Sequence, residues 1–573
     1  MSHNLARDQR RSGRGNVEAR KRRRMRPTML ALEDRRLLST FTVTSTLDIG
    51  SAGSLRWAIG QANSAGGAET IAFDSKVFKT PQTITLTGTQ LELTDTTGTE
   101  TITGPKAGVT VSGGGLSRVF QVDPGVTASI TGLTITGGKT TTNGGGLYNN
   151  GGTTTLTNCT VSGNSATDGG GGLYNNGGTT TLTNCTVSGN SAGSGGGVYN
   201  KAGTATLTNC TVSGNSATDG AGIYNEQGNA ILSKCTVTGN LDFGGGVNND
   251  GGNATLTMTN TSVSGNSGFG IYIWLGKATL SKCTLNGNSE GGLYNSGTAK
   301  LTNCTVSGNS GFTGGGVYND GKATLNYCTI SDNSAVKGGG LYNGYGKATL
   351  NNCTISGNSA SVSGGGVYNN DEGKTTLTNC TVSGNSAAVS GGGLFNGSYS
   401  YNGHTYPSLA TLTNCTVSGN SAVNGGGIAN QGTLNISSSC NIITNQASAE
   451  GGGIDTTSGK ATISDSFINS NLVNSSGTAL GGGISSKNSV LSLTNCTLNA
   501  NQANGATALG GGIYALNSTV NAQNCTVTGN QANGTVLGEG GGIYSYGGVL
   551  TLVASTVKGN KATTSGNDIF VHP

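Results

Sequence analysis

The sequence repeats itself, and this repeat constrains the fold more than any other feature. The unit reads T-L-T-N-C-T-V-S-G-N-S-A, then a variable loop, then G-G-G-[LVI]-Y-N and a short turn. From Leu133 to Ser555 it recurs over 16 intervals with a mean near 26 residues. Self-similarity at a period of about 20 to 50 residues indicates a solenoid, a propeller or another stacked array.

The length and composition of the unit narrow the choice further. Helical repeats need about 33 residues or more, and Gly, Thr and Ser fill helices poorly. The leucine-rich signature is missing, and short Thr/Val/Leu segments alternate between Gly and Asn turns instead. With 103 Gly, 6 Pro and 10% charged residues in 573, the chain resembles neither collagen nor a highly charged disordered protein. We therefore expect an all-β fold, a single-stranded parallel β-helix of about 20 coils whose interior is buried by stacking.

Period-2 alternation within each segment predicts which side chains face the interior. Cys159 and Val161 share one face, while Leu156 lies three positions before Cys159, so a bend near Asn158 must change the parity. We expect Leu147, Leu156, Cys159 and Val161 to point inward and to stack about 4.8 Å from their equivalents in the next coil.

Asn and Gly recur at the corners of the unit. One Asn per coil predicts a ladder of hydrogen-bonded amides, and Asn also tolerates the left-handed backbone of a sharp bend. The Gly triplets allow close backbone approach at a tight corner, so their occasional match to a phosphate-binding motif carries no meaning. The predicted Asn ladder comprises Asn164, Asn190, Asn215, Asn240, Asn266, Asn288, Asn309, Asn333, Asn358 and Asn385 and continues to Asn560.

The 13 Cys residues occupy one slot of the repeat. No C-x-x-C occurs and only three His exist, so we expect neither a zinc site nor another metal site. In-register stacking would hold the Cβ atoms about 4.8 Å apart, wider than a disulfide prefers, which predicts a buried, reduced Cys ladder. The Cys positions are 159, 185, 210, 235, 283, 304, 328, 353, 380, 415, 440, 496 and 525.

The net charge of +5 is concentrated at the N-terminus. Residues 1–36 hold 12 Lys/Arg against 4 Asp/Glu, whereas the remainder holds 19 against 22. Such a basic run can bind nucleic acid or anionic lipid, but no aromatic or folded platform accompanies it. We interpret residues 1–40 as a basic disordered or targeting segment and expect no nucleic-acid partner. No apolar stretch approaches the roughly 18 residues of a membrane span.

Three groups of residues carry a resemblance to known proteins. Gly145-Gly146-Leu147 and Val161-Ser162-Gly163-Asn164 resemble the GG[AG][ILV] and F-x-x-N motifs of right-handed parallel β-helix surface proteins with polymorphic-outer-membrane-protein-type repeats. Residues 53–59 and 69–74 look like the first segment of bacterial β-helix surface proteins. Leu32-Glu33-Asp34-Arg35-Arg36-Leu37-Leu38-Ser39 is similar to the N-terminal LE-x-R-x-LLS segment of many large exported proteins of planctomycete-type bacteria. The resemblance implies a right-handed helix in an extracellular or cell-surface protein.

These patterns divide the chain into four regions. After the basic segment, residues 41–130 are expected to form an N-terminal cap and irregular first coils. Ser54 can cap a short helix whose Leu55, Ala58, Ile59 and Ala62 share one face and cover the open end of the solenoid. Residues 131–560 form the regular repeats, with an insertion near 396–409, and residues 561–573 a C-terminal cap or tail.

The repeats lack the residue clusters that catalysis on polysaccharides needs. Polysaccharide enzymes of the pectin-degrading β-helix type need clustered carboxylates, and the Asp and Glu residues here are scattered over variable loops and turns. The G-x-S-x-G match at Gly189-Asn190-Ser191-Ala192-Gly193 is an ordinary copy of the GNSA turn. We therefore expect no catalytic residues, no cofactor and no metal, with a polysaccharide lyase or glycoside hydrolase as the alternative.

Two features could bind a ligand. A Tyr follows the inward aliphatic residue in 11 coils and is expected to face outward, where it could stack on sugars or simply on its neighbours. The insertion between Cys380 and Cys415 could carry binding residues or be merely tolerated. Lys322, Lys347 and Lys374 stack at one turn and could attract acidic glycans, although a solvated face explains them equally well. The candidate ligand-binding residues are Tyr318, Tyr342, Tyr368, Tyr399, Tyr401, His404 and Tyr406.

The sequence thus favours a non-catalytic, monomeric β-helix protein that is secreted or displayed at the bacterial surface. Its role would be adhesin-like or structural, with repeated side chains adding weak contacts to polysaccharide or cell-surface components through multivalency. A passive envelope spacer is a further alternative.

Overall fold

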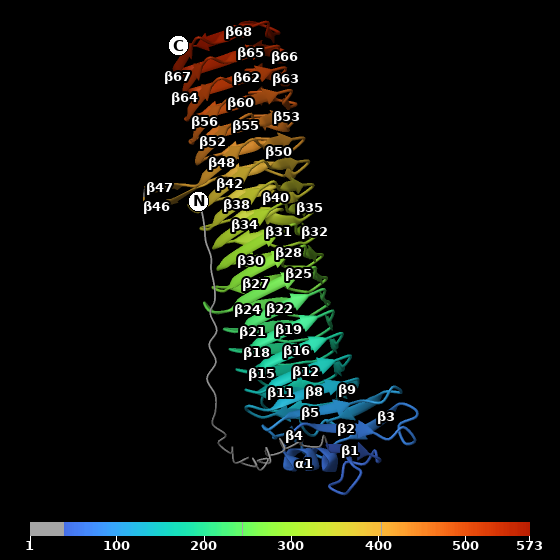
Figure 1. Ribbon diagram of the computed structural model, residues 1–573. Coiled ribbons are helices and arrows are strands. Elements are labelled where there is room, and N and C mark those ends of the chain that lie inside the picture. The colour runs from blue at the N-terminus through green and yellow to red at the C-terminus, as the bar shows by residue number, and fades with distance from the viewer. Residues whose placement is uncertain (1–38, 243, 403, 573) are drawn as a thin grey trace, which may run out of the picture. The chain divides into compact units, whose positions relative to one another are not determined.

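The computed structural model describes residues 39–242, 244–402 and 404–572, and these residues form a right-handed parallel β-solenoid with one short helix (Figure 1). The basic segment expected over residues 1–40 lies outside the described residues as far as Leu38. A regular coil contains three main strands, such as β15 (Leu173–Asn176), β16 (Thr179–Thr183) and β17 (Thr186–Ser188). The predicted fold class, with about 20 coils, is confirmed.

Successive coils pair strand on strand in parallel register. The next coil contains β18 (Val198–Lys201), β19 (Thr204–Thr208) and β20 (Thr211–Ser213), which pair with β15, β16 and β17. A further row of strands, from β36 (Ser334–Lys337) to β69 (Lys561–Ala562), forms where the variable loops of the later coils also pair. Equivalent residues of every repeat therefore form columns along the solenoid.

The interior follows the predicted alternation. Leu147, Leu156 and Val161 are fully buried and Cys159 is 2% exposed. The bend that changes the parity lies at Asn158, whose φ of 53° is left-handed. The left-handed residue beside the Asn164 ladder is Gly163 and not Asn164, because glycine adopts positive φ without a steric penalty.

Two buried Asn ladders run along the solenoid. The predicted ladder is confirmed: Asn164 Nδ2 donates to Asn190 Oδ1 at 3.0 Å, and the same bond recurs coil after coil. A second ladder, which the sequence reasoning missed, contains the Asn of the L-Y-N motif, where Asn149 Nδ2 donates to Asn175 Oδ1 at 2.7 Å. Both ladders also bond backbone carbonyls, so they satisfy the polar groups at the corners.

The Cys ladder is buried and contains no disulfide. All 13 Cys are free, and none is more than 2% exposed. Their thiols donate to backbone carbonyls, as Cys185 Sγ does to Leu156 O and Thr183 O. The slot therefore holds a small side chain with a weak donor, which explains why Thr261, Ser466 and Ser555 can replace Cys.

Helix α1 (Leu55–Ala65) covers the N-terminal end of the solenoid, where it packs against β1 (Ser39–Val43) and β2 (Glu69–Phe73) (Figure 1). Ser54 is the N-cap, and its hydroxyl accepts from Trp57 N at 3.0 Å. The buried residues of the helix are the four predicted ones, Leu55, Ala58, Ile59 and Ala62. The cap prevents the first coil from exposing an apolar edge.

The far end of the described chain continues the stack. Strand β70 (Ile569–His572) pairs with β67 (Ile543–Val553), and β69 pairs with β66 (Gln531–Glu539). Within the residues that the structure describes, no helix is long and apolar enough to cross a membrane.

Two carboxyl groups are stacked inside the first coils. Glu69 of β2 and Glu100 of β5 (Thr99–Thr103) are register partners, 2% and 0% exposed, with Asp95 close by. Asp95 N donates to Glu100 Oε1 at 3.1 Å. Burial, together with the charges of Asp95 and Glu69, raises the pKa of Glu100 from 4.5 to about 7.

This pKa makes stability depend on pH. The folded state holds the Glu100 proton more tightly than the unfolded chain does. The contribution of Glu100 to the free energy of unfolding is therefore fully present below about pH 4.5 and is lost as the pH rises through about 7. We expect a loss of about 3 kcal/mol over that window and a flatter profile for Glu100→Gln. Thermal unfolding at pH 5 and pH 8 measures the difference, with Glu92→Gln on the exposed side of β4 (Leu91–Leu93) as control. An equal pH dependence in wild type and Glu100→Gln would contradict the assignment.

Candidate functional site

The Tyr column forms a stacked aromatic ladder along one side of the solenoid. In its central run the ring centroids lie 4.5–5.2 Å apart with interplanar angles of 8–13°. This run consists of Tyr272, Tyr294, Tyr318, Tyr342, Tyr368 and Phe395. Each ring face is therefore covered by the ring of a neighbouring coil, and such stacking itself stabilises the sheet.

Three of the predicted ligand-binding residues belong to this ladder. The hydroxyls of Tyr318 and Tyr342 donate to Asp320 Oδ2 at 2.8 Å and Asp371 Oδ2 at 3.2 Å. Tyr368 is only 5% exposed, between Tyr342 and Phe395. The column points away from the central core, but loops and neighbouring rings cover much of it. A ligand could reach ring edges and not ring faces, and a binding role for these three residues stays a prediction.

The other four predicted residues come together on the insertion. It forms an antiparallel hairpin of β46 (Ser398–Tyr401) and β47 (His404–Pro407), which projects from the side of the solenoid in Figure 1. Tyr399 pairs with Tyr406 and Tyr401 pairs with His404. Since paired residues of antiparallel strands share a face, and residues two apart do also, all four rings lie on one face of the hairpin.

This aromatic face, defined by Tyr399, Tyr401, His404 and Tyr406, is open to solvent. The three tyrosines are 38%, 58% and 37% exposed, and His404 is exposed as well. The Tyr399 ring lies 6.3 Å from that of Tyr401, nearly parallel to it, and 6.4 Å from that of Tyr406. The opposite face carries only Ser398, Ser400, Thr405 and Pro407.

One further aromatic residue lies beside the hairpin and was missed by sequence reasoning. Tyr345 is 68% exposed on a neighbouring turn. Its turn follows Asn343, and register pairing from Asn343 to Asn369 and on to Asn396 places that turn two coils before the hairpin. The charge of Asp371 is the main cause that raises the pKa of the Tyr345 phenol. Its position between two glycines, Gly344 and Gly346, outside the repeat motif, was the available sequence signal.

A second missed group is acidic and buried. At Ala429, Asp455 and Ser485 the aromatic ladder is interrupted, and Asp455 is 7% exposed. Burial and the neighbouring Glu450 raise the pKa of Asp455 to about 6, while Lys487 forms an ion pair with Glu450. The sequence signal was the absence of Tyr at this position of the repeat, where most other coils have one. Because Asp455 is almost fully covered, we assign it no contact with a polymer ligand.

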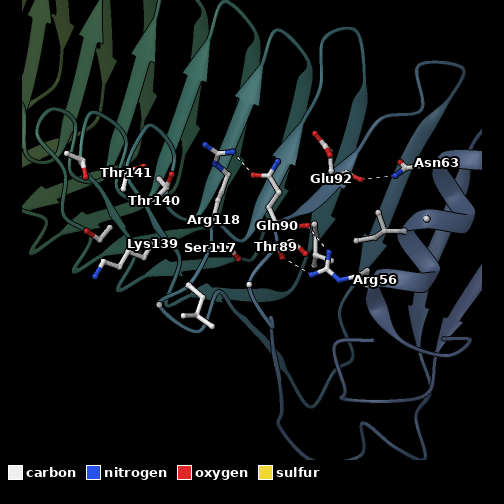
Figure 2. A pocket seen from close by; sticks show the side chains of 18 residues that line it. Arg56, Asn63, Thr89, Gln90, Glu92, Ser117, Arg118, Lys139, Thr140 and Thr141 are labelled. Atoms are coloured by element: carbon white, nitrogen blue, oxygen red, sulfur yellow. Dashed lines mark hydrogen bonds between the residues drawn. The ribbon is translucent and has the colours of Figure 1, made fainter. Parts of the chain in front are cut away.

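A cleft with a volume of about 930 Å³ lies near the N-terminal cap (Figure 2). The side chains of its two arginines form hydrogen bonds within the protein. Arg56 donates to Asp48 and to the carbonyls of Thr89 and Gln90, and Arg118 donates to Gln90 and the carbonyl of Asn143. The guanidinium of Arg118 also lies 4.8 Å from the Tyr148 ring centroid and so closes the first end of the aromatic ladder. Both arginines therefore hold the first coils together.

Titratable residues that could hold a metal ion do not converge in the described part of the chain: no group of three or more His, Cys, Asp or Glu side chains is suitably placed. The aromatic face of the hairpin is thus the best-defined candidate site. It offers apolar ring faces, phenolic hydroxyls and an imidazole on a rigid scaffold, which suits binding.

A protein-family model agrees with this architecture. The family model described as "Right handed beta helix region" matches residues 118–289 and 275–403. The chain is a right-handed β-helix protein. No curated protein sequence matches the β-helix protein. Among solved structures, it is similar to a crystal structure of the pectate lyase Pel9A, with 16% identity, coverage of 51% of this chain and 77% of that chain, and a TM-score of 0.32.

Proposed function

We propose that this β-helix protein is a non-catalytic glycan-binding protein, secreted or displayed at the bacterial surface. The observation that carries the proposal is the exposed aromatic face of the hairpin, with Tyr399, Tyr401, His404 and Tyr406 on one side. The resemblance of the repeats to polymorphic-outer-membrane-protein-type repeats, and of residues 32–39 to segments of exported proteins, supports the extracellular location.

The physical basis is stacking on the exposed rings. A sugar presents an apolar face of C–H groups that packs on an aromatic ring, while its hydroxyls hydrogen-bond the phenols and the imidazole. Tyrosine loses little conformational entropy on binding, and the two-stranded pairing holds the rings on one face of the hairpin. The hairpin connects β45 (Leu394–Asn396) and β48 (Leu409–Thr413), and both strands pair with the preceding coil and with the following coil.

A glycan array probed with the full chain tests the proposal. Tyr401→Ala removes the most exposed ring of the hairpin, and we expect at least tenfold weaker binding, since loss of one stacking contact of about 1.4 kcal/mol corresponds to that factor. Tyr327→Ala is the matched control, because Tyr327 is 63% exposed on another corner of the coil.

The outcomes separate the alternatives. Equal loss of binding in both variants would indicate nonspecific adsorption, and no binding by the wild-type protein would favour a passive envelope spacer. Release of shorter sugars from a bound polymer would favour the polysaccharide-degrading enzyme instead.

A further inference from the structure

Five consecutive coils below the hairpin each place one lysine on the same outer sheet face. Their strands are β28 (Lys277–Ser281), β31 (Thr298–Thr302), β34 (Lys322–Asn326), β38 (Lys347–Asn351) and β42 (Lys374–Thr378). All five lysines are exposed, and none of these strands contains an Asp or Glu. We call this surface the lysine row; it consists of Lys277, Lys300, Lys322, Lys347 and Lys374.

The register places these charges close together. Lys322 pairs with Lys347, and Lys347 pairs with Lys374, so successive backbones lie about 4.8 Å apart. Lys277 stands in the same column, two coils before Lys322, and Lys300 stands in the intervening coil, two residues along its strand. Positive charge therefore follows the solenoid axis without interruption over five coils.

Within the described residues, no ion pair is formed by the lysines of this row. The ion pairs found there join Arg56 to Asp48, Lys201 to Glu226 and Lys487 to Glu450. The turns before Lys322 and Lys374 carry three carboxylates, Asp320, Asp371 and Glu372, against the five lysines. Asp320 and Asp371 accept hydrogen bonds from tyrosine hydroxyls. Like charges directly opposite one another in a sheet are destabilising, so the row favours a ligand that brings negative charge.

The row also leads to the aromatic face. The residue that follows Lys374 in its column is Leu409, the first residue of β48, and the hairpin ends two positions earlier at Pro407. Threonine side chains at the second outward position, such as Thr324, Thr349 and Thr376, flank the lysines with hydroxyls. The column therefore combines cations with hydrogen-bonding groups and ends at the base of the hairpin that carries the aromatic face.

We propose that the lysine row binds an anionic polysaccharide, which lies along the solenoid axis and continues onto the aromatic face of the hairpin. The inference rests on the proposed glycan-binding function and specifies its ligand class: an extended chain with sulfate or carboxylate groups on successive sugars. Contacts that are weak singly add up because the rigid stack presents them at a constant spacing. Because the lysine charges are exposed, added salt should screen them and weaken the binding of the polysaccharide.

The test compares two triple variants of equal net charge. Lys322→Gln/Lys347→Gln/Lys374→Gln removes the three lysines of the row that are direct register partners. The control, Lys234→Gln/Lys282→Gln/Lys558→Gln, removes three exposed lysines outside this column. The immobilised probes are dextran sulfate, alginate and uncharged dextran at 0.15 M salt. We expect the first variant to bind the anionic probes at least tenfold more weakly than wild type, and the control to bind within twofold. Comparing dextran sulfate with alginate shows whether the row prefers sulfate or carboxylate groups.

The possible failures are distinguishable. If Tyr401→Ala loses binding and the row variant does not, the glycan-binding proposal stands and the lysine row is not part of the site. Equal losses in both triple variants, or equal binding to uncharged dextran, would overturn the inference. Tighter binding of duplex DNA than of either polyanionic glycan at the same salt would also overturn it.

Discussion

Gly339→Ala is expected to destabilise the solenoid by about 3 kcal/mol, the upper end of the range for overpacking. A Cβ at this position of the Gly triplet would overlap the carbonyl oxygen of Ser359 and stand 2.7 Å from that of Gly365, both in the next coil. Overpacking in a core typically costs about 1–3 kcal/mol, and backbone cannot rotate away as a side chain can. Thermal unfolding of the full chain, followed by circular dichroism, measures the effect.

Two other Gly→Ala variants separate steric overlap from backbone strain. Gly384 has a φ of 63° but its Cβ would come no closer than 4.0 Å to any neighbour, so Gly384→Ala should cost only about 1–2 kcal/mol. Gly60 lies inside α1 with nothing within 4 Å, and Gly60→Ala should stabilise by about 1 kcal/mol. If Gly339→Ala behaved like Gly384→Ala, close packing of the triplet would not be the reason for its glycines.

The fold could be predicted because every coil repeats the same strands, the same bends and the same inward-facing side chains. The 26-residue period indicated a stack, and the change of parity between Leu156 and Cys159 required a bend, which the structure shows at Asn158. The second Asn ladder at Asn149 could not be assigned from spacing alone. Its amide turns back to bond Gly152 O within its own corner, and that corner geometry is a tertiary property.

The candidate site was only partly predictable. The segment Tyr-Ser-Tyr-Asn-Gly-His-Thr-Tyr alternates on both sides of Asn402-Gly403, a hairpin turn signal, so a single aromatic face could have been inferred from the sequence. In contrast, alternation correctly turned Tyr368 away from the central core but did not reveal its burial. That burial depends on the rings of Tyr342 and Phe395 and on the loop that brings Lys337 over its ring.

Exposure thus distinguishes two uses of the same residue type. Stacked tyrosines with hydroxyls bonded to Asp320 or Asp371 contribute to the cohesion of the coils, whereas hairpin tyrosines leave their rings open. The solenoid provides a rigid support, and the lysine row and the hairpin provide the surface that varies from coil to coil. Binding on such a scaffold depends on the ladders that keep the columns in register.

Asn333→Ala is expected to weaken the pairing between neighbouring coils locally and to lower the free energy of local unfolding by about 4 kcal/mol. Asn333 is 1% exposed, and its Oδ1 accepts from Asn309 N at 3.0 Å and from Asn309 Nδ2 at 2.9 Å. Its Nδ2 donates to Val306 O and Asn358 Oδ1, both at 3.0 Å. Alanine would leave these buried groups with fewer partners, and each unsatisfied group costs about 1–3 kcal/mol.

Native-state hydrogen exchange of the full chain measures this locally, which suits a stack whose coils open independently. The amide of Asn309 should exchange about 1,000-fold faster in Asn333→Ala, since every 1.4 kcal/mol is a factor of ten. Asn351→Ala is the control: Asn351 Nδ2 donates to Asn326 Oδ1 at 2.9 Å on the half-buried outer face, so water can replace the bond and the cost should stay below about 1 kcal/mol. Similar exchange in the two variants would mean that the buried ladder contributes no more than an outer one, and that the apolar columns alone hold the coils together.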